Sequence, residues 1–101
     1  MEFINLTPHA VNIVDGPTIP SSGLCRLSVT TEEVGNIDGV PMVRTVYGDV
    51  QGLPSPKEGT IYIVSSLVAS RVPDRHDIAV PTEFVRDDAG RILGCRALSL
   101  N

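Results

Sequence analysis

Several residue types are scarce in this chain of 101 residues. Tryptophan is absent, only two phenylalanines and two tyrosines are present, and Lys57 is the single lysine beside seven arginines. With so few aromatic side chains, the hydrophobic core has to be built mainly from aliphatic residues. The formal net charge of −4 argues against duplex nucleic acid or an anionic membrane surface as a partner, because both attract clustered lysine and arginine.

Long apolar segments are also missing. No run approaches the roughly 18 apolar residues that a membrane-spanning helix needs. Residues 1–5 show neither the basic nor the apolar region of a signal peptide. The sequence therefore predicts a soluble protein of the cytoplasm that has no membrane partner.

Residues suited to metal or catalytic chemistry are few. Cys25 and Cys95 lack the paired spacing of a zinc site, and His9 and His76 have no spacing typical of metal ligands. We therefore expect free thiols, no metal and no cofactor. The glycine-rich nucleotide loops, the serine-hydrolase elbow and the zinc-protease motif are all absent. These absences favour a binding protein over an enzyme, and a small hydrolase with His9 or His76 as its base is a minor alternative.

Length and composition fit one domain spanning residues 1–101, because 42% of the residues are hydrophobic and a chain of this size supports a single core. Short β-branched and apolar runs alternate with Gly, Pro and Asp turns, whereas residues 66–72 have the period of a helix, capped by Ser65 and stopped by Pro73. These patterns predict an all-β fold with one short helix, a compact small barrel or sandwich of about six or seven strands. The predicted strands are residues 10–14, 24–31, 40–47, 60–64, 77–81, 84–86 and 91–98.

Some positions within this fold can be predicted more closely. Residues 60–64 are apolar on both faces, which is typical of a strand at the centre of a sheet. Asp38 and Gly39 form a dipeptide that favours a tight hairpin between the strands on either side. Residues 48–59 are rich in glycine and proline and are predicted to be the longest loop.

Alternating side chains also indicate which residues face the core. Cys25, Leu27 and Val29 share one face of their strand, and Cys95 is predicted to point inward from the last strand. Burial makes a thiol unreactive, so both cysteines are predicted to be structural.

The densest cluster of charged residues is the segment 71–77, which connects the predicted helix to a strand. Arg71 and Arg75 could clamp a phosphate, and Asp77 could hold a ribose hydroxyl or orient an arginine. Alternatively, the acidic and basic side chains of this segment neutralise one another on the surface.

Two further segments carry candidate ligand-binding groups. Thr7 and His9 flank a proline in a rigid tripeptide. Ser65 and Ser66 present hydroxyls and free backbone N–H groups at the helix start, where ordinary helix capping is the alternative interpretation. The full set of predicted ligand-binding residues is Thr7, His9, Ser65, Ser66, Arg71, Arg75 and Asp77.

Longer motifs are spread over nearly the whole chain. They are Asn5-Leu6-Thr7-Pro8-His9-Ala10-Val11, Gly52-Leu53-Pro54, Ile63-Val64-Ser65-Ser66-Leu67-Val68-Ala69, Arg75-x-Asp77 followed by Pro81, and Val85-Arg86-Asp87-x-x-Gly90-Arg91-x-x-Gly94-Cys95. Together these motifs resemble a family of small proteins encoded by tailed phages, prophages and some bacterial genomes. The resemblance implies a phage setting and carries no catalytic residue to this chain.

By analogy with other compact phage proteins, this resemblance implies an accessory protein that captures a small anionic ligand in the cytoplasm of the host cell. A cyclic nucleotide or an ADP-ribose derivative that signals in bacterial defence is the type of ligand expected. The alternative is a phage structural or protein-interaction component that binds no small molecule. In both cases, sheet edges left open by a small β-domain predict a homo-oligomer.

Overall fold

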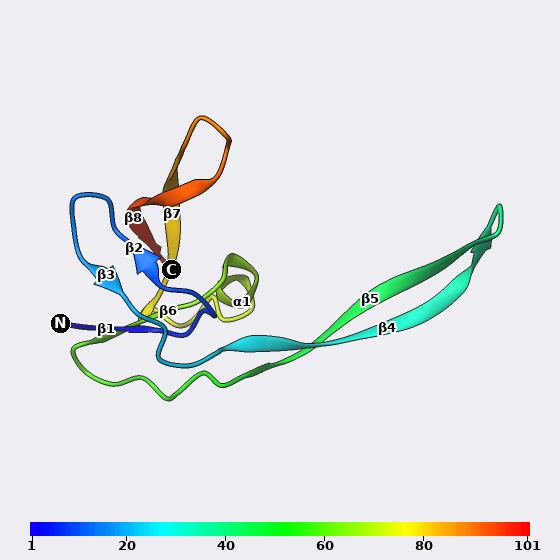
Figure 1. The fold of residues 1–101 in the computed structure, drawn as a ribbon. Helices are drawn as coiled ribbons and strands as arrows, with labels where there is room; N and C mark the ends of the chain where they lie inside the picture. The colour runs from blue at the N-terminus through cyan, green and yellow to red at the C-terminus, as the bar shows by residue number, and fades with distance from the viewer.

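The structure, a computed structural model, describes residues 1–101 and consists of a small body from which one long hairpin projects (Figure 1). It contains eight strands and one helix, so the predicted all-β fold with a single short helix is confirmed. The strands form three separate sheets and no closed barrel. The elements are β1 (Glu2–Asn5), β2 (Val11–Asn12), β3 (Thr18–Ile19), β4 (Arg26–Ile37), β5 (Val40–Gln51), β6 (Thr60–Ile63), α1 (Ser66–Ser70), β7 (Ile78–Arg86) and β8 (Ile92–Leu100).

The body is built on a four-stranded sheet with the strand order β1-β6-β7-β8. Strand β6 pairs in parallel with both β1 and β7, and β7 pairs antiparallel with β8. Because β6 has a neighbour along both edges and packing on both faces, Tyr62, Ile63 and Val64 are almost fully buried. The predicted central position of residues 60–64 is confirmed, whereas β1 is not among the predicted strands.

Two hydrophobic clusters form the core. The smaller cluster consists of Val11, Ile63 and Cys95. Both cysteines are buried, as predicted, with Cys25 in the larger cluster and Cys95 in the smaller one. Aliphatic residues predominate, as the scarcity of aromatic residues predicts. The larger cluster comprises Leu6, Cys25, Leu27, Tyr62, Val64, Val68, Ala69 and Ile78.

Helix α1 connects the parallel strands β6 and β7. The Ser65 side chain caps it by accepting a hydrogen bond from the backbone N–H of Val68 at 3.3 Å, which confirms the predicted cap. Val68 and Ala69 form its buried side. With five residues, this only helix is far too short to cross a membrane.

Strands β4 and β5 pair antiparallel along their length and form the projecting hairpin, which we call the arm (Figure 1). The predicted turn is present, with φ angles of 51° at Asp38 and 83° at Gly39. Every residue from Val29 to Asp49 is exposed. The arm is longer than predicted at both strands, and β5 extends to Gln51, into the segment expected to be a loop.

The prediction that Val29 faces the core is wrong. Cys25 and Leu27 are buried, but the Val29 side chain is 53% exposed. The register between β4 and β5 shifts between Leu27 and Val29. At that point the arm has left the body, so no further layer is present to cover the side chain.

The hairpin of β7 and β8 closes the chain as predicted. Its turn has Gly90 at a φ of 82°, and the Asp87 carboxylate accepts hydrogen bonds from the backbone N–H groups of Ala89 and Arg91. On the other side of β8, the N–H of Val14 donates to the carbonyl of Cys95 at 2.8 Å, which ties the β2–β3 hairpin to the main sheet.

Candidate functional site

The site that gathers most of the predicted ligand-binding residues is an open cavity of about 390 Å³ in the body. It lies between the loop after β1, strand β2, the start of α1 and the hairpin of β7 and β8. Four of the seven predicted residues line it, namely Thr7, His9, Ser65 and Ser66. The rest of the lining is Ala10, Val11, Asn12, Val64, Pro81, Phe84, Ile92, Leu93, Gly94 and Cys95.

Asn5 shapes the loop that carries Thr7 and His9. Its side chain is fully buried and donates from Nδ2 to the carbonyls of His9 at 2.8 Å and Ile19 at 3.0 Å. Its Oδ1 accepts from the backbone N–H of Thr7 at 3.0 Å and from the Thr7 hydroxyl at 2.6 Å. A second tie comes from Ser21, whose hydroxyl donates to the Thr7 carbonyl at 2.6 Å. Because these bonds fix both ends of the tripeptide, the loop is ordered before any ligand arrives.

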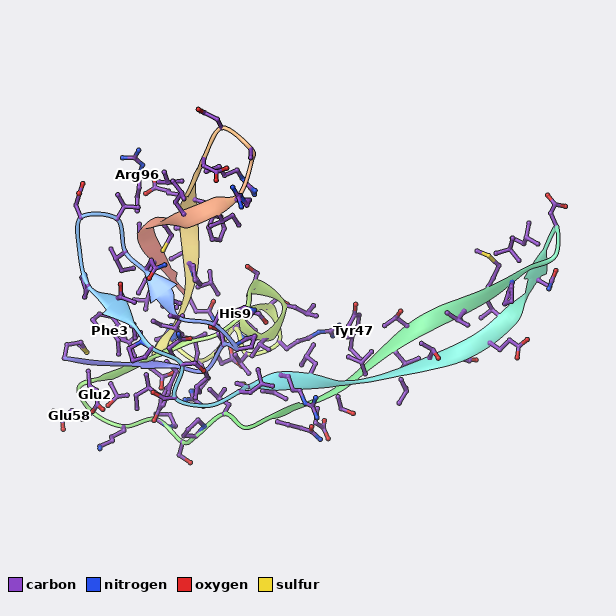
Figure 2. The ribbon with its side chains drawn as sticks, viewed as in Figure 1. Glu2, Phe3, His9, Tyr47, Glu58 and Arg96 are labelled. Carbon is purple, nitrogen blue, oxygen red and sulfur yellow. The ribbon has the colours of Figure 1, made fainter.

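The polar groups of the cavity differ in their freedom to bind a ligand. The Ser65 hydroxyl already accepts from α1, and the Thr7 hydroxyl is bonded to Asn5. His9 and Ser66 are exposed, and Figure 2 shows His9 beside α1. The two side chains come from segments more than fifty residues apart, and the fold brings them to the same cavity.

An apolar wall, which the sequence reasoning missed, faces these polar groups. Phe84, Ile92 and Leu93 line the cavity and remain 50%, 52% and 56% exposed. Glu83, immediately before Phe84, has a φ of 54°, a conformation that side-chain-bearing residues seldom adopt. Leu93 alternates with Cys95 and Ala97 like a core residue, and nothing in the sequence marks Phe84 or Ile92 as lining an opening.

The other three predicted residues do not line this cavity. Arg75 forms a bidentate ion pair with Asp77, from Nε to Oδ1 and from Nη2 to Oδ2, both at 2.8 Å. The same Nη2 donates to the carbonyl of Pro54 at 3.0 Å. This hydrogen-bonded pairing holds the pKa of the Asp77 carboxyl below its ordinary value and raises the pKa of Arg75.

Arg75 and Asp77 therefore match the alternative interpretation of their segment, in which opposite charges neutralise each other. Their side chains are only 22% and 16% exposed, and they attach the loop after β5 to the start of β7. Arg71 is exposed at the end of α1, with its guanidinium 5.3 Å from the centre of the Tyr47 ring on the arm (Figure 2). Arg75 is thus paired with Asp77, whereas Arg71 contacts Tyr47.

The other titratable residues were compared with the requirements of a metal site and of a reactive thiol. No group of three or more His, Cys, Asp or Glu side chains is arranged to hold a metal ion. Burial raises the pKa of the Cys25 thiol, and the nearby positive charge of Arg75 only partly opposes this effect. A thiol of this kind is a poor nucleophile at neutral pH.

The sequence matches no protein-family model, and no curated protein or solved structure matches the chain. The function of the cavity has to be inferred from its own chemistry.

Proposed function

We propose that the protein captures a small nucleotide-type ligand in the cavity formed by Thr7, His9, Ser65 and Ser66. The observation that carries the proposal is the convergence of these residues, from two distant segments, on one cavity. Its volume of about 390 Å³ is in the range of small-molecule sites, which is roughly 300–1,000 Å³. The cavity also combines an apolar wall with a few polar groups, the usual composition of such sites.

The two sides of the cavity suit different parts of a nucleotide. The half-exposed ring of Phe84, with Ile92 and Leu93 beside it, offers an apolar surface for a planar base. His9 and Ser66 supply hydrogen-bonding groups for a sugar or a phosphate, and a protonated histidine adds positive charge. The sequence carries none of the familiar catalytic motifs, which favours capture without turnover. Capture of a defence signal is the role that the phage resemblance implies.

Thermal unfolding measured with ADP-ribose and with cyclic di- and trinucleotides tests the proposal. A ligand present at 100 times its dissociation constant adds about 2.7 kcal/mol to the free energy of unfolding, so binding is expected to raise the melting temperature by several degrees. His9→Ala and Phe84→Ala are each expected to weaken binding at least tenfold.

The chain provides matched controls for both variants. His76 and Phe3 are the only other histidine and phenylalanine, and neither lines the cavity. His76→Ala and Phe3→Ala should leave the affinity unchanged. If none of these nucleotides shifts the melting temperature, or if the control variants weaken binding equally, the proposed site is wrong.

A second candidate function is a protein-interaction component, and the arm is the observation that favours it. Twenty-one consecutive residues, from Val29 to Asp49, are exposed in a structure whose body is otherwise small. A ligand-binding role for the cavity does not require such a projection. Thermal unfolding with the same nucleotides separates the two functions, because an interaction component without a ligand would show no shift of its melting temperature with any of them.

A further inference from the structure

The arm projects from the body (Figure 1), and both of its strands carry exposed apolar side chains. A two-stranded hairpin of this kind is marginally stable on its own in water. Its large apolar side chains together expose on the order of 500 Å² of apolar surface, divided between the two faces of the hairpin because neighbours such as Met42 and Val43 point to opposite sides. They are Val29, Val34, Ile37, Val40, Met42, Val43, Val46 and Tyr47, each between 39% and 61% exposed.

We propose that the arm binds a second copy of this chain, with the two arms side by side and antiparallel. In this arrangement the tip of each arm lies at the root of the other. The inference does not depend on the ligand-binding cavity, and three features of the arm support it.

The first feature is an apolar groove at the root of the arm. It has a volume of about 260 Å³, and its apolar lining includes three half-exposed side chains, Leu24, Val29 and Leu67. Four residues of the larger cluster also line it, and the rest of the lining is Thr7, Pro8, Arg26 and Ser65. At the tip, Ile37 and Val40 are paired across the turn and are 61% and 57% exposed. The most exposed apolar pair of the arm thus lies at its tip. In the antiparallel pair, the tip of one copy is placed at the apolar groove of the other.

The second feature is the distribution of charge along the arm. The outer half carries Glu32, Glu33 and Asp38 against one arginine, Arg44, which is opposite Glu32 in the register. The root carries Arg26 and Asp49, which offset each other, and Arg71 lies close by over Tyr47 and adds a positive charge. An antiparallel pair therefore brings the acidic tip of each copy to the arginines of the other. A parallel pair would place the acidic tips together, which like charges disfavour.

The third feature is the length of the arm. Each of its strands has twelve residues, about 40 Å at the usual rise per residue. The paired arms are related by a two-fold axis through their middle. Because such an interface uses the same surface on both copies, the contact between tip and root occurs twice. The outer edges of β4 and β5 also have unpaired backbone groups that a second arm could satisfy.

Analytical ultracentrifugation of the full chain at micromolar concentrations tests the assembly. The expected mass is twice the 10.8 kDa of one chain. The double variant with Ile37→Asp and Val40→Asp should sediment as a monomer, with the dissociation constant raised at least tenfold, and should still fold because both positions are exposed at a hairpin tip. Ile92→Asp is the matched control, since Ile92 is 52% exposed on another hairpin, and it should remain dimeric.

Cross-linking tests the arrangement. The native cysteines are buried and give no background, so Ile37→Cys is mixed with Leu67→Cys and the sample is oxidised. A disulfide-linked pair of the two variants is expected, and Ile37→Cys alone should form none.

A mass of one chain at all concentrations would overturn the proposal, as would a disulfide between two Ile37→Cys tips, or a dimer that the tip double variant leaves intact. Recovery of a stable complex with a different protein, without self-association, would also overturn it.

Discussion

At the scale of single residues, the same types of side chain have different tasks in this protein. Arg75 and Asp77 form a mostly buried bidentate pair that connects two segments of the body, whereas Arg71 stands exposed over Tyr47. The Asn5 side chain satisfies all of its hydrogen-bonding capacity, in three bonds to the loop that carries His9 and one to Ile19 of β3. The sequence identifies Arg71, Arg75 and Asp77 as candidate ligand-binding residues. Only their contacts in the folded protein distinguish a structural role from a binding role.

The Arg75–Asp77 pair leads to a prediction about pH. Because the pKa of Asp77 is lowered in the folded protein, the pair contributes stability above the ordinary carboxyl pKa of about 4 and loses it as the pH falls through the lowered value. Asp77→Asn is expected to reduce the free energy of unfolding by about 1–2 kcal/mol at pH 7. In urea unfolding series, the difference from wild type should shrink as the pH falls below about 4, because Asp77 becomes protonated there.

Asp88→Asn is the control for this experiment, because Asp88 is exposed in the turn between β7 and β8. It should change the stability little at either pH. A difference between Asp77→Asn and wild type that stays constant down to pH 2 would contradict the structural role of the pair.

At the scale of secondary-structure elements, the way the arm leaves the body depends on Gly52, directly after β5. Gly52 has a φ of 84°, and a Cβ built on it would lie 2.5 Å from the carbonyl oxygen of Leu24. Gly90 has nearly the same φ, 82°, but a Cβ there meets nothing within 4 Å. The two positions therefore separate the cost of the backbone conformation from the cost of lost space.

We expect Gly90→Ala to reduce the free energy of unfolding by about 1 kcal/mol, the cost of a left-handed conformation alone. Gly52→Ala should cost at least about 2–3 kcal/mol, because the backbone segments at Leu24 and Gly52 also have to move apart. Equilibrium urea unfolding of the two variants measures both values. Equal losses would show that the close approach of Leu24 to Gly52 is not important for stability.

The sequence predicts those elements that depend on local signals. The turn at Asp38 and Gly39, the cap at Ser65 and the closing hairpin all follow from residues next to one another in the chain. Strand β1 was missed because four residues carry little pattern, and it is a strand only through its pairing with the distant β6. The arm was predicted too short because its outer residues are polar or exposed, and the alternation that marks a half-buried strand fades there.

The candidate site likewise combines residues that the sequence predicts with residues that only the fold reveals. Thr7, His9, Ser65 and Ser66 were predicted from their own chemistry, and the fold brings them together. Phe84 and Leu93 were missed, because an apolar residue that lines an opening has the same sequence pattern as one that fills a core.

At the scale of the whole molecule, the proposed pairing of arms makes stability depend on protein concentration. A partner that binds only the folded chain shifts the unfolding equilibrium by mass action. The melting temperature of the wild type is therefore expected to rise by several degrees when the protein concentration is raised a hundredfold. Differential scanning calorimetry at several concentrations measures the shift, and the variant with Ile37→Asp and Val40→Asp should show none.

The parallel pairing of β1 with β6 has a consequence for how the protein is made. Glu2 is opposite Thr60 in the register, so the first strand leaves the ribosome long before its partner exists. The arm, whose strands are neighbours in the chain, can pair in the meantime, and pairings between distant segments form more slowly than local ones. During synthesis the nascent chain thus exposes an apolar hairpin before it has a sheet, which is the stage at which such chains tend to aggregate. The acidic residues near the arm's tip would keep neighbouring nascent chains apart at that stage.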